Sequence, residues 1–246
     1  MNTSTARLTA RLLRALVAIE LLLVALYWLD ILCGEPPLLN PLFDLDGEGN
    51  IPAWFSSAQL LLIALTLWTA NRFRRREPLP PRRFVNLLAA GFLVLSLDET
   101  AQVHETITGV IGSRYADWVP HLVSSHKAFA VLATVGVFWV MKTFYKDARA
   151  AWRWSRRECT ICLLGVSIVL LGGSLIEAIG YLYLQKGTPA YHIEVSFEEF
   201  FEMLGETLIL RAVLAFARDA CRRGPAPAPR QNVVDSPLTW QYNRPT

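Results

Sequence analysis

Long apolar stretches alternate with short polar ones along the chain, and six of the apolar stretches approach or exceed the length that crosses a bilayer as an α-helix. In lipid a helix satisfies all of its own backbone hydrogen bonds, so these stretches are expected to be helical. The pattern predicts an all-α polytopic membrane bundle of six transmembrane helices. We expect the spans at residues 12–32, 53–72, 84–106, 124–145, 160–184 and 192–216.

Basic residues divide the polar segments into two groups. Lysine and arginine gather at the N-terminus, in the loops after the second and fourth spans, and after the sixth span, whereas the other three loops carry few. Because positive charge is retained on the cytoplasmic side, both termini are predicted to be cytoplasmic. We expect residues 1–220 to form the membrane domain and the Pro/Ala-rich residues 221–246 to form a disordered cytoplasmic tail.

The amino-acid composition supports a membrane protein and argues against one other class of protein. Of the residues in the chain, 53% are hydrophobic and 18% are charged. In a soluble domain about a quarter of the residues are charged. No basic patch is interleaved with aromatic residues, which excludes a nucleic-acid-binding protein. The expected surroundings are the lipid bilayer, and the oligomeric state is left open.

The sixth span carries an unusual number of acids for a membrane helix: Glu194, Glu198, Glu199, Glu202 and Glu206. Four of them follow one another at intervals of four residues, which keeps them on one side of a helix. A carboxylate inside a membrane is costly, so it faces the bundle interior and usually marks a site. The row needs protons, a metal ion or basic partners to neutralise it.

Other predicted spans bring ionisable residues to the same outer half of the bilayer. The third span contributes Asp98, Glu99 and His104, the fourth His126 and the fifth Glu177. Asp98, Gln102 and Glu105 are expected on one face of the third span. Gly173 and Gly180 share a face with Glu177, and small residues at that spacing let a neighbouring helix approach closely. We therefore expect Glu177 to face protein.

Carboxylates with imidazoles are a ligand set for iron, zinc or manganese. The expected metal ligands are Asp98, His104, His126, Glu177, Glu198, Glu202 and Glu206. Glu99 and Glu199 are the candidate catalytic acids or bases. This arrangement favours a metal-dependent membrane hydrolase or oxidoreductase acting on a lipid or isoprenoid substrate, although the usual Glu-x-x-His repeat of di-iron proteins is absent.

Two other functions remain open. The row could be a ladder of binding sites in a proton or cation transporter or channel, or its acids could pair with basic groups of a partner in an assembly subunit. Acids that reach Glu206 and no deeper favour a one-sided site, unless Glu20 of the first span continues the path inward.

The first predicted loop contains DLDGEGN, residues 44–50, which resembles the start of a calcium loop. The bidentate glutamate that completes such a loop is absent, because Phe55 stands at its position. A polar turn is the favoured interpretation.

Three segments carry a resemblance to a known group: NIPAWFSS at 50–57, SLDETAQVHE at 96–105 and EEFFEMLGE at 198–206. Together they resemble an uncharacterised family of small multipass bacterial inner-membrane proteins with no established activity. The resemblance covers most of the second to sixth spans. It implies a multipass topology and an inner-membrane location, and it supplies no chemistry.

Overall fold

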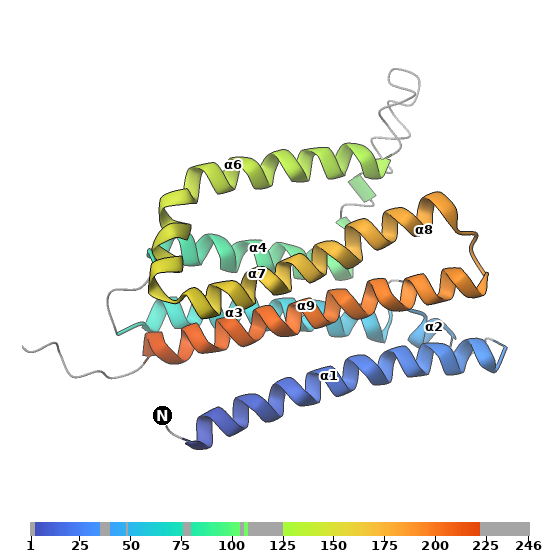
Figure 1. The fold of residues 1–246 in the computed structure, drawn as a ribbon, viewed down its shortest axis with the longest axis horizontal. Coiled ribbons are helices and arrows are strands. Elements are labelled where there is room, and N and C mark those ends of the chain that lie inside the picture. The colour runs from blue at the N-terminus through green and yellow to red at the C-terminus, as the bar shows by residue number, and fades with distance from the viewer. Residues whose placement is uncertain are drawn as a thin grey trace, which may run out of the picture.

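The computed structural model describes residues 3–34, 40–47, 49–75, 80–103, 106–107 and 125–221. All regular structure among these residues is helical, as the sequence predicts (Figure 1). The helices are α1 (Thr3–Leu32), α2 (Asn40–Phe43), α3 (Ile51–Phe73), α4 (Arg82–Ala101), α6 (Ser125–Trp154), α7 (Arg156–Leu170), the π-helical segment η1 (Leu171–Ile176), α8 (Glu177–Tyr183) and α9 (Pro189–Cys221).

Four helical segments are long and apolar enough to cross a membrane. They are Arg7–Leu32, Ile51–Phe73, Arg82–Ala101 and the continuous run Arg156–Gly180. The chain is therefore an all-α bundle with the composition of a membrane protein. Helix α9 is at least as long as these spans, but it carries more charged residues than they do, among them its five glutamates.

Helix α9 packs against more of the other helices than any other described element. Figure 1 shows it running between α1 on one side and α7 with α8 on the other, and it also packs on α3. Helix α4 pairs with α3 and makes little contact with α6. Following the predicted topology, we call the end of the bundle near Glu194 the outer end and the end near Ala220 the inner end.

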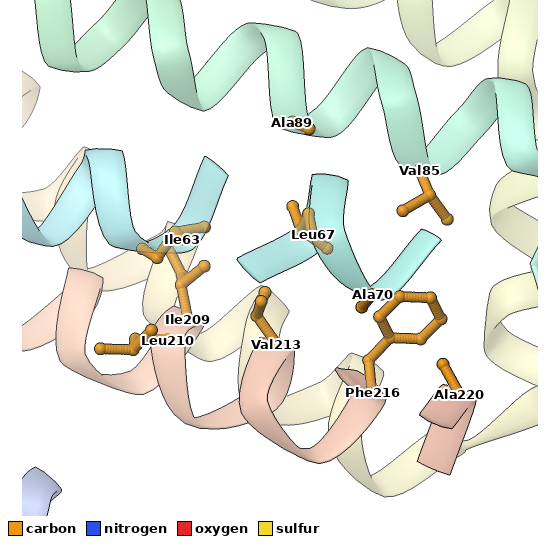
Figure 2. Packing of buried hydrophobic residues seen from close by; sticks show 10 residues of the cluster. All are labelled: Ile63, Leu67, Ala70, Val85, Ala89, Ile209, Leu210, Val213, Phe216 and Ala220. Atoms are coloured by element: carbon orange, nitrogen blue, oxygen red, sulfur yellow. The ribbon is translucent and has the colours of Figure 1, made fainter. Parts of the chain in front are cut away.

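The inner half of the bundle holds the largest apolar cluster. Figure 2 shows buried side chains of α3, α4 and the second half of α9 meeting there. The cluster consists of Ile63, Leu67, Ala70, Val85, Ala89, Ile209, Leu210, Val213, Phe216 and Ala220. Burial of branched aliphatic side chains at regular helical spacing fixes the rotation of α3 and α9 about their axes.

Glycines bring α7 and α9 into backbone contact. A Cβ atom placed on Gly205 would lie 2.6 Å from the carbonyl oxygen of Gly165, and a Cβ on Gly165 would lie 2.6 Å from that of Gly205. Close approach at small residues is how membrane helices gain packing energy when lipid offers no hydrophobic gain.

The π-helical segment η1 continues this contact toward the outer end. A Cβ on Gly172 would lie 2.7 Å from the Glu198 carbonyl oxygen, and one on Gly173 would overlap the Glu202 carboxylate. A π-helical turn shifts the helix face and is frequent at functional sites. The widened turn therefore places two glycines directly against the acidic part of α9.

The third predicted span ends earlier than expected. Helix α4 ends at Ala101, and Gln102 adopts a left-handed conformation with φ of 50°, its N–H bonded to the Asp98 carbonyl. The prediction that Asp98, Gln102 and Glu105 share one helix face is therefore wrong for Gln102. Glu105 lies outside the described residues.

We predict that Gly205→Ala destabilises the bundle. The new methyl group would meet backbone atoms of Gly165 and Val169, an overpacking that costs about 1–3 kcal/mol. Thermal unfolding in detergent should show a midpoint lowered by about 2–10 °C. Gly91→Ala on α4 is the matched control, because its Cβ meets nothing within 4 Å, and its midpoint should be unchanged or higher. Equal midpoints for the two variants would contradict the close contact.

Candidate acidic site

The acids of α9 occupy the outer half of the helix. From Glu194 to Glu206 the row covers about 18 Å of helix axis, which is more than half of a hydrocarbon core about 30 Å thick. Glu198, Glu199 and Glu202 are half-buried and Glu206 is buried. Within the described chain no hydrogen bond or ion pair involves the carboxylates of the first four acids of the row. The row is thus sheltered without being neutralised by a described cationic side chain.

Acids from two other helices lie opposite this row. The Glu202 carboxylate is within electrostatic range of Glu99 on α4 and Glu177 on α8, and Glu199 is within range of Glu99. Asp98, beside Glu99 on α4, is half-buried. The structure therefore gathers Glu99, Glu177 and the α9 row, three of the elements that the sequence predicted to converge.

The π-helical segment η1 and helix α8 approach the row along glycines that both contain. A Cβ on Gly180 would overlap the Glu194 carboxylate, as one on Gly173 would overlap that of Glu202. The expected close approach of a neighbouring helix at these glycines is confirmed. Glu177 lies between these two glycines in the chain, and its side chain is exposed. The expectation that Glu177 faces protein is therefore only partly met.

The histidines of the predicted metal set are not placed. His104 lies outside the described residues, and His126 belongs to α6 but its side chain is outside the described set. Among the residues that are described, no group of three His, Cys, Asp or Glu side chains is arranged to hold a metal ion. Of the assigned carboxylates, Glu177, Glu198 and Glu202 lie within electrostatic range of one another.

A buried polar network joins the row to α1 and α3. The Thr207 hydroxyl donates to Glu20 Oε1 at 2.6 Å. The Gln59 amide donates to Thr207 Oγ1 at 2.7 Å and to Glu20 Oε1 at 3.3 Å. Ser56 donates to Glu206 Oε1 at 2.9 Å. Glu206 is in turn within electrostatic range of Glu20, Glu99 and Glu202. We call Glu20, Ser56, Gln59, Glu206 and Thr207 the inner network.

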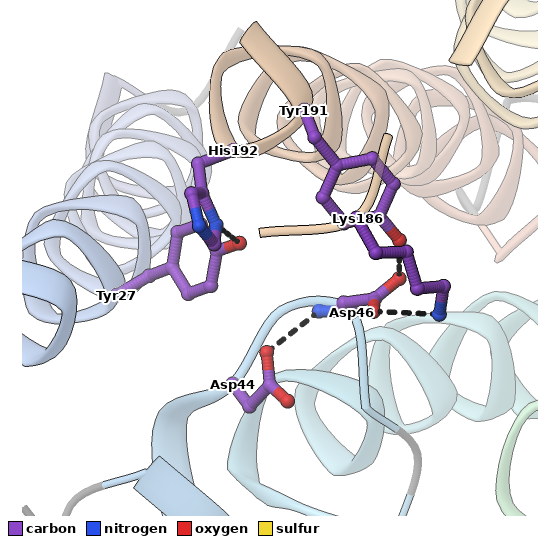
Figure 3. Close-up of polar contacts among 6 residues, drawn as sticks. All are labelled: Tyr27, Asp44, Asp46, Lys186, Tyr191 and His192. Atoms are coloured by element: carbon purple, nitrogen blue, oxygen red, sulfur yellow. Dashed lines mark hydrogen bonds and ion pairs between the residues drawn. The ribbon is translucent and has the colours of Figure 1, made fainter. Parts of the chain in front are cut away.

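At the outer end, the segment before α3 is tied to the start of α9 (Figure 3). Asp46 accepts a hydrogen bond from the Tyr191 hydroxyl. Its carboxylate also forms an ion pair with Lys186 Nζ at 3.1 Å. The Tyr27 hydroxyl and His192 Nδ1 lie 2.8 Å apart. Burial, followed by the hydrogen bond to Asp46, raises the pKa of Tyr191 above its ordinary range, so this phenol stays a donor at neutral pH.

The described residues of the DLDGEGN segment, which exclude Glu48, form a capped turn. The Asn50 side chain donates to the Asp44 and Gly47 carbonyls at 2.5 Å each, and its oxygen accepts from the Ala53 N–H at 3.0 Å, which caps α3. Gly49 has a φ of +73°, where a glycine is favoured. Since Asp46 is already bound to Tyr191 and Lys186, the geometry agrees with a polar turn.

A small apolar cavity of about 90 Å³ lies near the inner end. Leu67, Phe84, Trp154, Cys162 and Phe216 are among its lining residues. Phe216 and Glu194 are separated by about 33 Å along the axis of α9. The cavity is therefore far from the outer acids, and a lipid tail bound in it would not lie beside them.

These features define an all-helical membrane protein with an acidic interior. The sequence matches a family model over residues 12–217, described as a domain of unknown function (DUF8692). The chain belongs to this family, which confirms the expectation of an uncharacterised family. No curated protein and no solved structure matches the chain.

Sequence reasoning missed the two hydroxyl residues of the inner network. Gln59 and Glu20 stand out as polar residues inside apolar runs, which is a usable signal. Ser56 and Thr207 give no such signal, because single hydroxyl residues are common in membrane helices and usually bond to their own backbone. Buried Asp30, which accepts from Asn40 at 3.0 Å, was also missed.

We predict that Thr207→Val weakens the fold through the inner network. The change keeps the shape of the side chain but removes one donor from Glu20 and one acceptor from Gln59, a loss of about 1–3 kcal/mol of unfolding free energy. Denaturant unfolding in detergent measures it. Thr69→Val on α3 is the control, because the Thr69 hydroxyl is exposed and bonds only to its own helix. If both variants lose the same amount, the network does not stabilise the bundle.

Proposed function

We propose that this protein is an ion-translocating protein of the bacterial inner membrane, with six spans and cytoplasmic termini, in which the α9 row carries protons. The row of carboxylates supports this function because neighbouring acids in a low-dielectric interior cannot all remain ionised. Protons shared among them neutralise the row and can move from one carboxylate to the next. Such chains of intramembrane acids mark proton relays in pumps and transporters.

The observation that carries the proposal is the hydrogen-bonded link between α9 and Glu20. A row that ended at Glu206 would favour a one-sided site. Instead Thr207, the next residue, donates to Glu20 on α1, and Glu206 lies within electrostatic range of the same carboxylate. The polar path therefore extends from the outer end of α9 to the middle of α1.

The inner apolar cluster would act as the gate of this path. Ile63, Leu67 and Leu210 fill the bundle beyond the inner network, and no acid is among the residues of that cluster. Hydrophobic constrictions gate ion pathways by excluding water. We infer that translocation needs α9 or α1 to move relative to α3, so that Glu20 gains access to the cytoplasmic side.

Proton flux into liposomes tests the proposal. Purified protein reconstituted into vesicles with a pH gradient and a potassium–valinomycin potential should carry protons, followed with a pH-sensitive dye. Glu202→Gln and Glu20→Gln should each reduce the rate at least about tenfold, since this needs only about 1.4 kcal/mol of added barrier. Asp219→Asn is the control, because Asp219 pairs with Arg218 outside the row, and it should transport normally. No flux above that of empty vesicles would contradict the proposal.

A metal-dependent membrane enzyme is the second candidate. The convergence of carboxylates from α4, α8 and α9 around Glu202 favours it, since di-metal sites are built from carboxylates of facing helices. Iron, zinc or manganese would be held by these carboxylates with His104 and His126, near the outer leaflet where a lipid or isoprenoid substrate would bind.

Metal analysis separates the two candidates. On the enzyme hypothesis, the purified wild-type protein contains stoichiometric metal, and Glu202→Ala and His104→Ala both lose it. Metal-free wild-type protein with proton flux supports translocation instead. Absence of both would favour an assembly subunit whose acids pair with a basic partner.

A further inference from the structure

We propose that the inner network is a binding site for one small dehydrated monovalent cation of the sodium class. This inference deepens the proposed function, because it names a second ion at the inner end of the same path. Binding of the cation does not itself depend on proton flux, so each can be tested separately. The site would be built by α1, α3 and α9 together.

The hydrogen bonds of the network use up its donors. Ser56 directs its one hydroxyl hydrogen to Glu206, and Thr207 directs its own to Glu20. The side-chain amide of Gln59 has two hydrogens, which match its bonds to Thr207 and Glu20. No donor of these three residues remains for another acceptor.

Three buried oxygens of the network are left over. Glu20 Oε2, Gln59 Oε1 and Glu206 Oε2 are shielded from solvent and have no hydrogen-bond partner among the described residues. Their side chains are at least nine-tenths buried, with residue exposures of 0%, 2% and 3%. A buried acceptor without a partner has lost its hydration without a compensating hydrogen bond. The three atoms belong to two neighbouring hydrogen-bonded groups, Ser56 with Glu206 and Gln59 with Thr207 and Glu20, which adjoin at residues 206 and 207 of α9. Unpartnered acceptors in both groups point to a missing positive ligand.

The ligand chemistry of these atoms is that of a hard cation. All three are oxygens, from carboxylate or amide groups, and neither sulfur nor imidazole is part of the network. Oxygen ligands select hard cations over zinc or copper. The hydroxyl oxygens of Ser56 and Thr207 each keep a lone pair, so that up to five protein oxygens are available.

Size and hydration decide among the hard cations. Magnesium gives up its water reluctantly, and the network is buried, so it does not suit this ion. Calcium takes about six to eight oxygens, more than the five that the network offers. A monovalent ion of the sodium class needs fewer ligands, and one proton on the other carboxylate completes the neutralisation of Glu20 and Glu206.

Direct sodium binding tests the inference. Purified full-length protein, kept in choline chloride at constant ionic strength, is titrated with NaCl by calorimetry and with radioactive sodium. We expect saturable binding of one ion per chain, not displaced by MgCl₂. Glu20→Gln and Gln59→Leu should weaken the affinity at least about tenfold, which corresponds to about 1.4 kcal/mol.

Two controls keep this result interpretable. Asn71→Leu removes another buried amide of α3, one that bonds to Arg82 and Asn86 away from the network, and it should bind sodium normally. Ser56→Ala is a smaller change that should weaken sodium binding without unfolding the protein. It replaces Gln59→Leu in the test if that variant is unstable. Size-exclusion profiles and helix content identify folded variants.

The possible outcomes are distinct from those of the flux experiment. Wild-type protein that is folded but binds no sodium overturns the inference, even where proton flux persists. Sodium binding that survives in both Glu20→Gln and Ser56→Ala also overturns it, because the ion then sits elsewhere. Sodium binding by a protein without proton flux upholds the cation site and overturns only the proposed translocation.

Discussion

Taking carboxylates out of water is the constraint on which this structure depends. The acids of α9 lie in a helix that must be sheltered by others, yet their charge cannot be left uncompensated in a low-dielectric interior. Glu99 and Glu177 add two more acids within electrostatic range of Glu202. No described cationic side chain pairs with the first four acids of the α9 row. In the proposed function, protons or a metal or alkali cation supply the positive charge.

The two halves of α9 meet this constraint in different ways. In the outer half, Gly172, Gly173 and Gly180 allow η1 and α8 to lie directly against the acids, so little lipid can reach them. In the inner half, the same helix presents Ile209, Leu210 and Val213 to α3 (Figure 2). Glu206 and Thr207 lie at the boundary, where the inner network connects α9 to α1. The acids of α9 thus lie in its outer half, and its largest apolar contact lies in its inner half.

Much of this arrangement follows from local sequence patterns. Helical fold class, the five glutamates of α9 and the glycine face of η1 and α8 could be predicted, because each depends on spacing along a single helix. The end of α4 at Ala101 could not be predicted. Gln102 adopts a left-handed conformation there, and no glycine, the residue that usually indicates such a conformation, stands at this position. The pairing of Glu20 with Thr207, 187 positions apart in the chain, depends on how α1 packs on α9 and has no local signal. The glycines of η1 likewise pack against Glu198 and Glu202 of α9, a contact that the sequence of η1 alone does not specify.

The central claim is that the acids of α9 and α1 form one buried, proton-holding group. Labelling of native membranes with a lipid-soluble carbodiimide in sodium-free medium at neutral pH, followed by peptide mapping, tests it most directly. Such a reagent modifies protonated carboxyls inside the bilayer, so the account predicts modification within Glu198–Glu206 and at Glu20, and none at Asp46 or Asp219. Unmodified α9 and α1 carboxyls in a folded protein would mean that the acids are ionised and solvated, and would contradict the account.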